Sequence, residues 1–445
     1  MKNNSKFSYA PLKINENLKL ISLASLDIET FEDQYSKEQI PLCITACIKL
    51  NLHNNNSHNF ATICILLDVE LFNSNILNRE KSLAKFWKSF WSEINKIALI
   101  EGHHKLCFMV HNLGKFDGSF LIKGLMYAVD YNLVNTLIDN QHKFITISAP
   151  LKNVKIVLRD SMRIFPVSLQ ELCEVFKVKG KFSKYNPEFN KLSILKPGNP
   201  LHKQFIEYAI QDSVSLLNTM SKAQTIYFKK HHVDICSIVS TASLSLKIFR
   251  TKYLDFNIPV LNNHLDKFIR YSYYGGATDY YKGYGKDLYY YDVNSLYPFV
   301  MLKNMPYKPL KWFEDMSEIK LEDFFGFALA RIECGNNVKL PVLPFKSRSL
   351  DQRILYPRGV FTEVYFSEEL KAAEKLGYKI KLLKGQSFSK SKMFNNYIED
   401  FYLIKKESEN DSPERFIAKL HLNTLYGIFG KTAQAGQRYS RNKNN

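Results

Sequence analysis

The sequence predicts an α/β fold with two or three domains. The chain has 445 residues, 45% of them hydrophobic, which is enough to bury more than one apolar core. Short apolar runs of strand length, such as residues 20–30, alternate with longer segments of helical periodicity, such as residues 81–97. A mixture of both kinds of element along the chain is typical of an α/β protein.

The charge balance points to a polyanionic partner. The formal net charge is +18 and the isoelectric point is about 9.3, which favours nucleic acid first and an anionic membrane surface second. A basic surface that only aids solubility fits the same numbers. No run of eighteen apolar residues occurs, so we expect no membrane span and no membrane partner.

The cysteines and the overall composition suggest a reducing compartment, such as that of an organelle. The seven cysteines are odd in number and show no C-x-x-C spacing, so we expect reduced, mostly buried thiols. The first ten residues lack both the apolar core of a signal peptide and an Arg-rich amphipathic helix. Asn, Lys, Ile, Phe and Tyr are abundant, which suggests an AT-rich genome such as that of an organelle or its plasmids. We therefore expect a mitochondrial location, with the cytoplasm as the alternative.

Acidic side chains lie on or beside several expected elements of the first half. Asp27 and Glu29 lie two apart on the strand over 20–30, so both side chains leave the same face and can bind a divalent metal. Asp117 begins a helix after the strand over 107–112, and Asp212 lies one turn after Tyr208 on a helix over 200–217. The remaining elements expected there are two strands within 40–67 joined by a polar loop, a strand over 155–159 and helices over 81–97 and 233–247.

A second acidic centre is expected at Asp292. Aromatic and β-branched residues over 280–291 predict a strand that delivers this carboxylate to its end, and Ser295, Tyr297 and Pro298 predict a turn after it. A carboxylate in that position is a common way to hold Mg²⁺ against a phosphate. Asp292 taken alone also fits a turn residue or a helix cap. Further on we expect strands near 327–334 and 358–366 and a helix near 367–376.

Two antiparallel helices are expected near the end, over 394–406 and 413–426. Pro413 and Gly427 mark the start and the stop of the second helix. Spacings of four, four and three place a polar stripe on one side of it: Arg415, Lys419, Asn423 and Tyr426. Such a stripe can hold a triphosphate and stack a base, although a solvated basic face has the same pattern.

The segments around Asp292 and Lys419 resemble two motifs of family B DNA polymerases. Asp292-Val-Asn-Ser-Leu-Tyr-Pro298 resembles motif A, and Lys419 through Gly427 resembles motif B, with Thr424 where the family usually has Ser. The resemblance implies that Asp292 binds catalytic metal, Tyr297 packs under the sugar and Lys419 holds the incoming dNTP. It also implies that Asn423 and Tyr426 line the nascent base pair. A phosphate contact by Arg415 is expected from its spacing alone.

The acidic segments of the first half resemble the three exonuclease motifs of the same family. These are Asp27-Ile-Glu29, the segment Asn112 to Asp117, and Tyr208-x3-Asp212. The resemblance implies an RNase H-like 3′–5′ exonuclease with two Mg²⁺ or Mn²⁺ ions per site, held by Asp27, Glu29, Asp117 and Asp212. It further implies that Tyr208 orients the attacking water and that three residues grip the single-stranded 3′ end: Asn112, Phe116 and Ser161. Asp-x-Glu by itself also arises by chance about once in a chain of this length.

A pair of glycines lies between the two halves. Tyr273-x-Gly275-Gly276 reads by itself as a turn or as a backbone that approaches a phosphate closely. It also resembles a short motif that, in the protein-primed branch of family B, links the two active sites and contacts the template strand.

The resemblance as a whole implies a protein-primed polymerase that replicates a linear plasmid or organellar DNA. Its partners would be single-stranded 3′ ends, primer–template DNA, dNTPs and a terminal protein primer. The expected domains are an exonuclease over 1–240, a linker over 241–290 and a partial palm with helical fingers over 291–445.

The family's Tyr-x-Asp-Thr-Asp hairpin and its thumb are not found in the sequence, so we expect the N-terminal part of such an enzyme. Only 26 residues precede Asp27, too few for a fused terminal protein. Two alternatives remain open at this point: a chain that retains only the 3′–5′ exonuclease, and a non-catalytic DNA-binding remnant.

Overall fold

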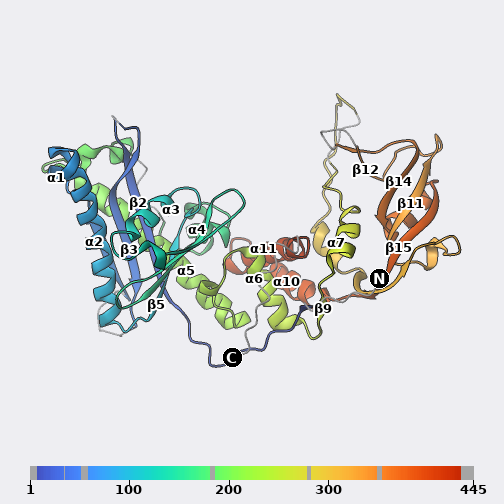
Figure 1. The fold of residues 1–445 in the computed structure, drawn as a ribbon, viewed down its shortest axis with the longest axis horizontal. Helices are drawn as coiled ribbons and strands as arrows, with labels where there is room; N and C mark the ends of the chain where they lie inside the picture. The colour runs from blue at the N-terminus through green and yellow to red at the C-terminus, as the bar shows by residue number, and fades with distance from the viewer. Residues whose placement is uncertain are drawn as a thin grey trace. The chain divides into compact units, whose positions relative to one another are not determined.

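The computed structural model describes residues 8–34, 36–51, 59–180, 186–277, 282–347 and 353–431. The chain divides into two compact units (Figure 1). We call Lys13–Ile248 with Leu403–Ile428 the N-terminal unit, and Met1–Leu12, Phe249–Tyr402 and Phe429–Asn445 the C-terminal unit. The chain therefore leaves the N-terminal unit after residue 248 and returns to it at residue 403.

The N-terminal unit is built on a seven-stranded mixed sheet with the order β4-β3-β2-β5-β8-β7-β6. The central pairs β2–β5 and β5–β8 are parallel, and the other pairs are antiparallel. The strands are β2 (Ser22–Glu32), β3 (Gln39–Lys49), β4 (Phe60–Leu66), β5 (Lys105–Val110), β6 (Asn135–Ile138), β7 (Phe144–Pro150) and β8 (Lys155–Asp160). The central strands are buried along most of their length, as expected for a sheet that is covered on both faces.

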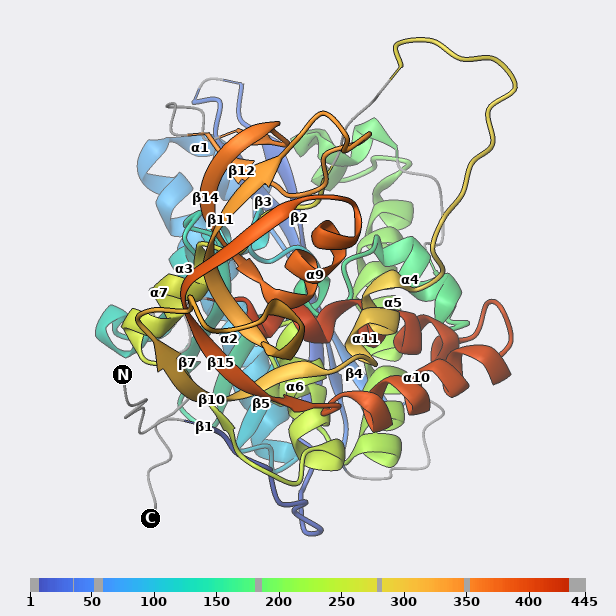
Figure 2. The ribbon, with the colours of Figure 1, turned by 90° about the vertical axis from the view of Figure 1, so that its right-hand side faces the viewer.

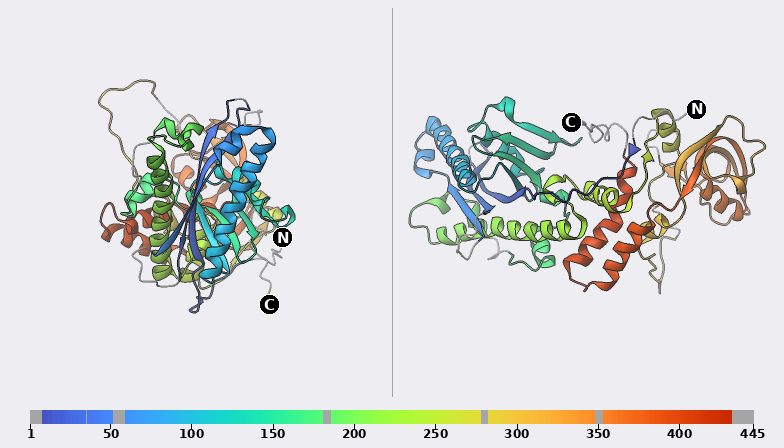
Figure 3. Two further views of the ribbon diagram at one scale, coloured as in Figure 1. Left: turned by 90° about the vertical axis from the view of Figure 1, so that its left-hand side faces the viewer. Right: turned by 90° about the horizontal axis from the view of Figure 1, so that it is seen from below.

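Helices cover both faces of this sheet, and Figure 3 shows it lying between α2 and α5. The helices of the unit are α1 (Val69–Ser74), α2 (Ile76–Ile100), α3 (Asp117–Leu125), α4 (Leu169–Val175), α5 (His202–His231), α6 (Thr241–Ile248) and α11 (Pro413–Phe429). The expected apolar face of α2 is confirmed, because Phe86, Trp87, Phe90, Trp91 and Ile94 are all buried in the core. The helix expected over 233–247 is wrong in its first half: Asp234 caps a short 3-10 turn at Ile235–Ser237, and α6 starts only at residue 241.

The C-terminal unit contains a four-stranded antiparallel sheet with the order β10-β15-β11-β14 (Figure 2). These strands are β10 (Met305–Phe313), β11 (Gly326–Cys334), β14 (Gly359–Phe366) and β15 (Lys379–Ser391). Helix α9 (Ser367–Lys375) buries Leu370 and Ala373 against this sheet. The expected strands near 327–334 and 358–366 and the helix near 367–376 are confirmed, whereas the 13-residue strand β15 was not predicted.

Smaller elements complete the C-terminal unit. They are the pairs β1 (Ser8–Tyr9) with β9 (Ile258–Pro259) and β12 (Phe345–Lys346) with β13 (Ile354–Leu355), and the helices α7 (Asn263–Arg270) and α8 (Leu296–Met301). Helix α10 (Asn395–Glu407) begins in this unit and ends in the other. Short turns of π- or 3-10 helix lie at Phe249–Tyr253 and Leu321–Asp323 in this unit, and further 3-10 turns lie in the N-terminal unit at Tyr131–Leu133, Ser161–Arg163, Pro187–Asn190 and Leu192–Leu195.

The strand expected over 280–291 is wrong as far as the described residues reach. Residues 282–294 form an extended loop ahead of α8, drawn in yellow in Figure 2, and belong to no strand. Tyr289, Tyr290 and Tyr291 are 84%, 92% and 87% exposed. A β-propensity segment forms a strand only when a neighbouring strand accepts its hydrogen bonds, and among the described residues none pairs with this one.

The described helices include none that is both long and apolar enough to cross a membrane.

Candidate active site

Strand β2 and helix α5 bring acidic side chains to one face of the sheet. Asp27 lies opposite Thr45 in the β2–β3 ladder, and Glu29 lies opposite Cys43, so these positions share a face. The Thr45 hydroxyl donates a hydrogen bond to the Ala209 carbonyl at 3.1 Å, which turns this face towards α5. Asp212, one turn further along α5, therefore meets the two carboxylates of β2.

The three carboxylates form a cluster with the dimensions of a metal site. One oxygen from each of Asp27, Glu29 and Asp212 lies within 4.8 Å of the other two. Asp212 is buried and the other two side chains are half-buried. In the described parts of the chain this is the one cluster of at least three metal-ligating side chains. Three neighbouring negative charges withdrawn from water are costly unless a cation neutralises them.

Asp117 adds a fourth carboxylate next to this cluster. It is the first residue of α3, is 3% exposed, and its Oδ1 accepts no hydrogen bond from the described residues. Burial, and then the neighbouring charge of Asp27, raises the pKa of Asp117 well above its usual value. A bound divalent ion would give Asp117 Oδ1 a partner and would supply positive charge to offset the neighbouring carboxylates. The donor set consists only of oxygen atoms, which fits Mg²⁺ or Mn²⁺.

The buried carboxylate of Asp160 holds the loop that leads to Asp117. Its Oδ1 accepts hydrogen bonds from the backbone N–H groups of Asn112 and Met162 at 3.1 and 3.0 Å, and its Oδ2 accepts one from Gly114 at 3.0 Å. These bonds fix Asn112 in a left-handed conformation with a φ of 74°. We did not predict this role. The available signal was an aspartate that ends a strand and directly precedes a polar turn.

The residues expected to grip a DNA end differ in their surroundings. The Phe116 ring is 39% exposed and packs against Phe120 in an edge-to-face arrangement at 5.3 Å between centroids, so part of the ring is open to solvent. Asn112 is half-buried beside it. Ser161 is fully buried, and its hydroxyl donates to the Val110 carbonyl and shares a hydrogen bond with His111. The Ser161 side chain is thus buried and hydrogen-bonded within the unit, and its expected contact with DNA stays a prediction.

Tyr208 lies one turn before Asp212 on α5, as its spacing predicts. It is 5% exposed and its ring packs against Phe189 at 5.2 Å between centroids. The structure thus brings all five expected exonuclease positions to one region of the N-terminal unit: Asp27, Glu29, Asp117, Tyr208 and Asp212.

Helix α11 presents the expected polar stripe in part. Lys419, Asn423 and Tyr426 are exposed on one side, and we call these three residues the α11 stripe. The opposite side of the helix is buried and includes Ile417, Ala418, His421, Leu422, Leu425 and Ile428. Arg415 is half-buried, and its Nη1 donates to the Lys405 carbonyl in the last turn of α10. Its guanidinium therefore joins the two helices, and the expected phosphate contact of Arg415 stays a prediction.

The remaining expected residues lie in the C-terminal unit. Asp292 is exposed in the loop ahead of α8, and Tyr297 is 54% exposed within α8. Tyr273 is 73% exposed, and a Cβ added at Gly276 would meet nothing within 4 Å. Gly275 has almost as much free space. This backbone is open enough for the close approach of a phosphate.

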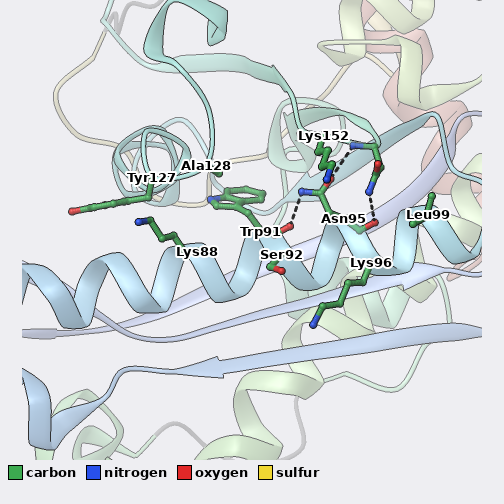
Figure 4. Close-up of a pocket in the computed structure, with 10 residues that line it drawn as sticks. Lys88, Trp91, Ser92, Asn95, Lys96, Leu99, Tyr127, Ala128 and Lys152 are labelled. Carbon is green, nitrogen blue, oxygen red and sulfur yellow. Dashed lines mark hydrogen bonds between the residues drawn. The ribbon is translucent and has the colours of Figure 1, made fainter.

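Two surface hollows of the N-terminal unit contain none of the expected site residues. One, of about 340 Å³, runs along α2, where Lys88, Asn95 and Lys96 lie near Tyr127 and Lys152 (Figure 4). Asn95 is held there by hydrogen bonds with Trp91 and Asn153. The other hollow, of about 560 Å³, is basic and is lined by Lys177, Lys179 and Lys222 among others. Neither holds an acidic cluster.

The sequence is similar to that of known DNA polymerases. Residues 102–195 and 181–440 match the family described as DNA polymerase type B, organellar and viral. A probable DNA polymerase of Podospora anserina is 35% identical over 342 residues, which are 76% of this chain and 25% of the relative. A probable DNA polymerase of Agaricus bitorquis is 29% identical over 92% of this chain and 55% of its own length. The DNA polymerase of Bacillus phage phi29 is 27% identical over 72% of this chain and 58% of its own length.

The fold is similar to that of a solved polymerase. The phi29 DNA polymerase in complex with primer–template DNA and incoming nucleotide substrates superposes with a TM-score of 0.62 and 20% identity. The match covers 92% of this chain and 68% of the phage enzyme. This chain spans about half or less of the length of the fungal relatives. The family match covers most of the chain, and we conclude that it belongs to the type B DNA polymerases of organelles and viruses.

Proposed function

We propose that this chain carries the 3′–5′ exonuclease and nucleotide-binding parts of a protein-primed DNA polymerase. The observation that carries the proposal is the carboxylate cluster of Asp27, Glu29 and Asp212, with the buried and unsatisfied Asp117 beside it. A phosphodiester is itself an anion, so a site of this kind can act on it only with cations in place. Similarity to polymerases that use DNA and nucleotides supports both substrates.

In the proposed exonuclease, the acidic residues hold two Mg²⁺ or Mn²⁺ ions. When bound, these ions neutralise the charge of the scissile phosphate and activate a water molecule. Tyr208, buried one turn from Asp212, orients that water through its hydroxyl. Phe116 stacks on the terminal base of a single strand with its exposed ring face. Asp160 keeps the loop before Asp117 in place through its three backbone hydrogen bonds.

In the proposed polymerase part, the α11 stripe receives the incoming dNTP. Lys419 holds the triphosphate by charge, and Asn423 and Tyr426 line the base. Asp292 holds a catalytic metal ion and Tyr297 packs under the sugar. This reaction needs positioning and charge neutralisation rather than a covalent enzyme intermediate.

Further partners and the location are part of the same proposal. Tyr273, Gly275 and Gly276 contact the template strand with their exposed side chain and open backbone. A terminal protein supplies the primer, and the enzyme replicates linear plasmid or organellar DNA in mitochondria. The basic net charge of +18 and the abundance of residues encoded by AT-rich codons support these assignments.

The exonuclease is tested with the 445-residue chain and a 5′-labelled single-stranded oligonucleotide. We expect shortening from the 3′ end that requires Mg²⁺ or Mn²⁺ and stops with a chelator. Asp27→Ala combined with Glu29→Ala should lower the rate by about 10³-fold or more, because several kcal/mol of charge stabilisation are lost. Asp130→Ala, which changes an exposed carboxylate outside the cluster, is the matched control and should keep the rate. A wild-type chain without metal-dependent degradation would contradict the exonuclease assignment.

The polymerase part is tested on a primed template with dNTPs. Extension that is lost on Asp292→Ala would support the full proposal. Degradation without extension would leave only the exonuclease, and salt-sensitive DNA binding with neither activity would indicate a binding remnant. Lys419→Ala should raise the dNTP concentration needed for half-maximal binding or extension, without changing the exonuclease rate.

A further inference from the structure

The buried side of α11 contains a histidine between two hydroxyl groups. His421 is 0% exposed, and its Nε2 lies 2.8 Å from the Tyr227 hydroxyl of α5. Its Nδ1 lies 2.6 Å from the Ser245 hydroxyl of α6. Burial, with a smaller effect of His231, lowers the pKa of His421 to about 3, so the ring is neutral at pH 7. A neutral imidazole has one donor and one acceptor nitrogen, which matches two hydroxyl partners.

Neighbouring contacts extend this anchor over two turns of α11. The Thr424 hydroxyl lies 3.1 Å from the same Ser245 hydroxyl. The Tyr227 ring meets the His421 ring edge-on at 5.5 Å between centroids. Ile417 and Leu425, each about one turn from His421, are buried on the same side. Hydrogen bonds, apolar packing and ring contacts thus act on the same side of the helix.

The anchor lies opposite the α11 stripe. Successive residues of an α-helix are separated by about 100°, so His421 points about 200° away from both Lys419 and Asn423. Apolar burial is not directional, and Ile417, Leu422 and Leu425 alone would tolerate a modest rotation of the helix. Hydrogen bonds depend on angle and distance, so two of them on one imidazole restrict that rotation. The direction in which the stripe faces therefore depends on His421.

We propose that His421 is a positioning residue for nucleotide binding, which fixes the rotation of α11 through Tyr227 and Ser245 and so aims the α11 stripe. This inference rests on the proposed role of the stripe in binding dNTP. It also means that the nucleotide-binding helix is fastened to α5, the helix that carries Tyr208 and Asp212.

Three substitutions in the full chain separate the parts of the anchor. Tyr227→Phe and Ser245→Ala each remove one hydroxyl with little change in volume, and His421→Leu removes both hydrogen bonds of the ring. His421→Gln keeps a polar group that can reach one hydroxyl and serves as the conservative variant. Tyr131→Phe, which removes the hydroxyl of a 68% exposed tyrosine in the same unit, is the matched control.

The first measurement is the equilibrium binding of a fluorescent dNTP in the presence of Mg²⁺, together with the exonuclease rate of each variant. We expect the Kd for dNTP to rise about tenfold or more in His421→Leu and three- to tenfold in Tyr227→Phe and Ser245→Ala. His421→Gln should recover part of the loss, and Tyr131→Phe should bind as the wild type does. The exonuclease rate should stay within twofold throughout. A parallel fall of both activities would mean a general loss of folding and would overturn the positioning role.

The second measurement is hydrogen exchange of the α11 amides, which does not depend on nucleotide. We expect residues 417–426 to exchange about tenfold faster in His421→Leu, with β2 and β3 unchanged. Unchanged exchange in α11 would overturn the inference whether or not nucleotide binds. If the wild type binds no dNTP, the proposed role of the stripe fails, while faster exchange in the variant would still support the anchor itself.

Discussion

Lowering the pH from 7.5 to 5.0 should destabilise the N-terminal unit by about 2 kcal/mol through His421 alone. The pKa of this buried imidazole is about 3 in the folded chain, against 6.5 for an unperturbed histidine. The unfolded chain therefore takes up a proton as the pH falls through about 6.5, whereas the folded chain does so only near pH 3. Protonation favours the unfolded state across that interval, so stability is present above pH 6.5 and is lost progressively below it.

The magnitude follows from the two values. At pH 5.0 the unfolded histidine lies about 1.5 pH units below its pKa, and each unit corresponds to 1.36 kcal/mol. The resulting loss is about 2 kcal/mol relative to pH 7.5, where the unfolded side chain is almost entirely neutral. It would be larger still towards pH 4 if the chain remained folded.

Urea unfolding followed by tryptophan fluorescence measures this loss. The chain has three tryptophans, of which Trp87 and Trp91 lie in the N-terminal unit and Trp312 in the other, so a Trp312→Phe background reports on the relevant unit. In that background, the free energy of unfolding of the parent should fall by about 2 kcal/mol more between pH 7.5 and 5.0 than that of His421→Gln. Parallel pH curves for the two proteins would refute the reasoning.

Three further perturbations follow from contacts in the same unit. Asp160→Ala leaves three backbone N–H groups without their acceptor and should cost about 3 kcal/mol in urea unfolding, with a lower exonuclease rate. Gly124→Ala would place a Cβ 2.3 Å from the Trp87 ring and should cost about 1–3 kcal/mol, visible as a lower Tm; an unchanged Tm would contradict this packing. Phe116→Ala should weaken single-strand binding by about 1–3 kcal/mol in fluorescence anisotropy, whereas Met126→Ala, at a 56% exposed position, should not.

Patterns local to one element predicted much of the fold and of the proposed exonuclease site. The two-residue period of β2 placed Asp27 and Glu29 on one face, and the helical period of α5 placed Tyr208 one turn from Asp212. Both hold in the structure, because these elements bury apolar faces that their own sequence specifies. The convergence of the two elements was expected from the family resemblance rather than from periodicity.

Features that depend on distant partners escaped prediction. The segment before Asp292 has high β-propensity, yet strand formation depends on a neighbouring strand. Ser161 was expected at a DNA end from the family resemblance, and its burial depends on contacts with His111 and Val110, about 50 residues earlier in the chain. The anchor at His421 joins residues that are 194 and 176 positions apart. Its one local sign was a histidine on the apolar side of a helix.

The interrupted path of the N-terminal unit has a consequence for how the protein is made. Its sheet is complete once residue 160 has been synthesised, but α11 begins only at residue 413. Until then, the surfaces of α5 and α6 against which α11 packs through His421 are not covered by that helix. A nascent chain would expose these surfaces of α5 and α6 while the 154 residues from 249 to 402 are being synthesised. A fragment that ends at residue 248 would expose them permanently. Fragments of the N-terminal unit that include residues 403–428, joined by a short linker, should therefore be more soluble than those that end at residue 248.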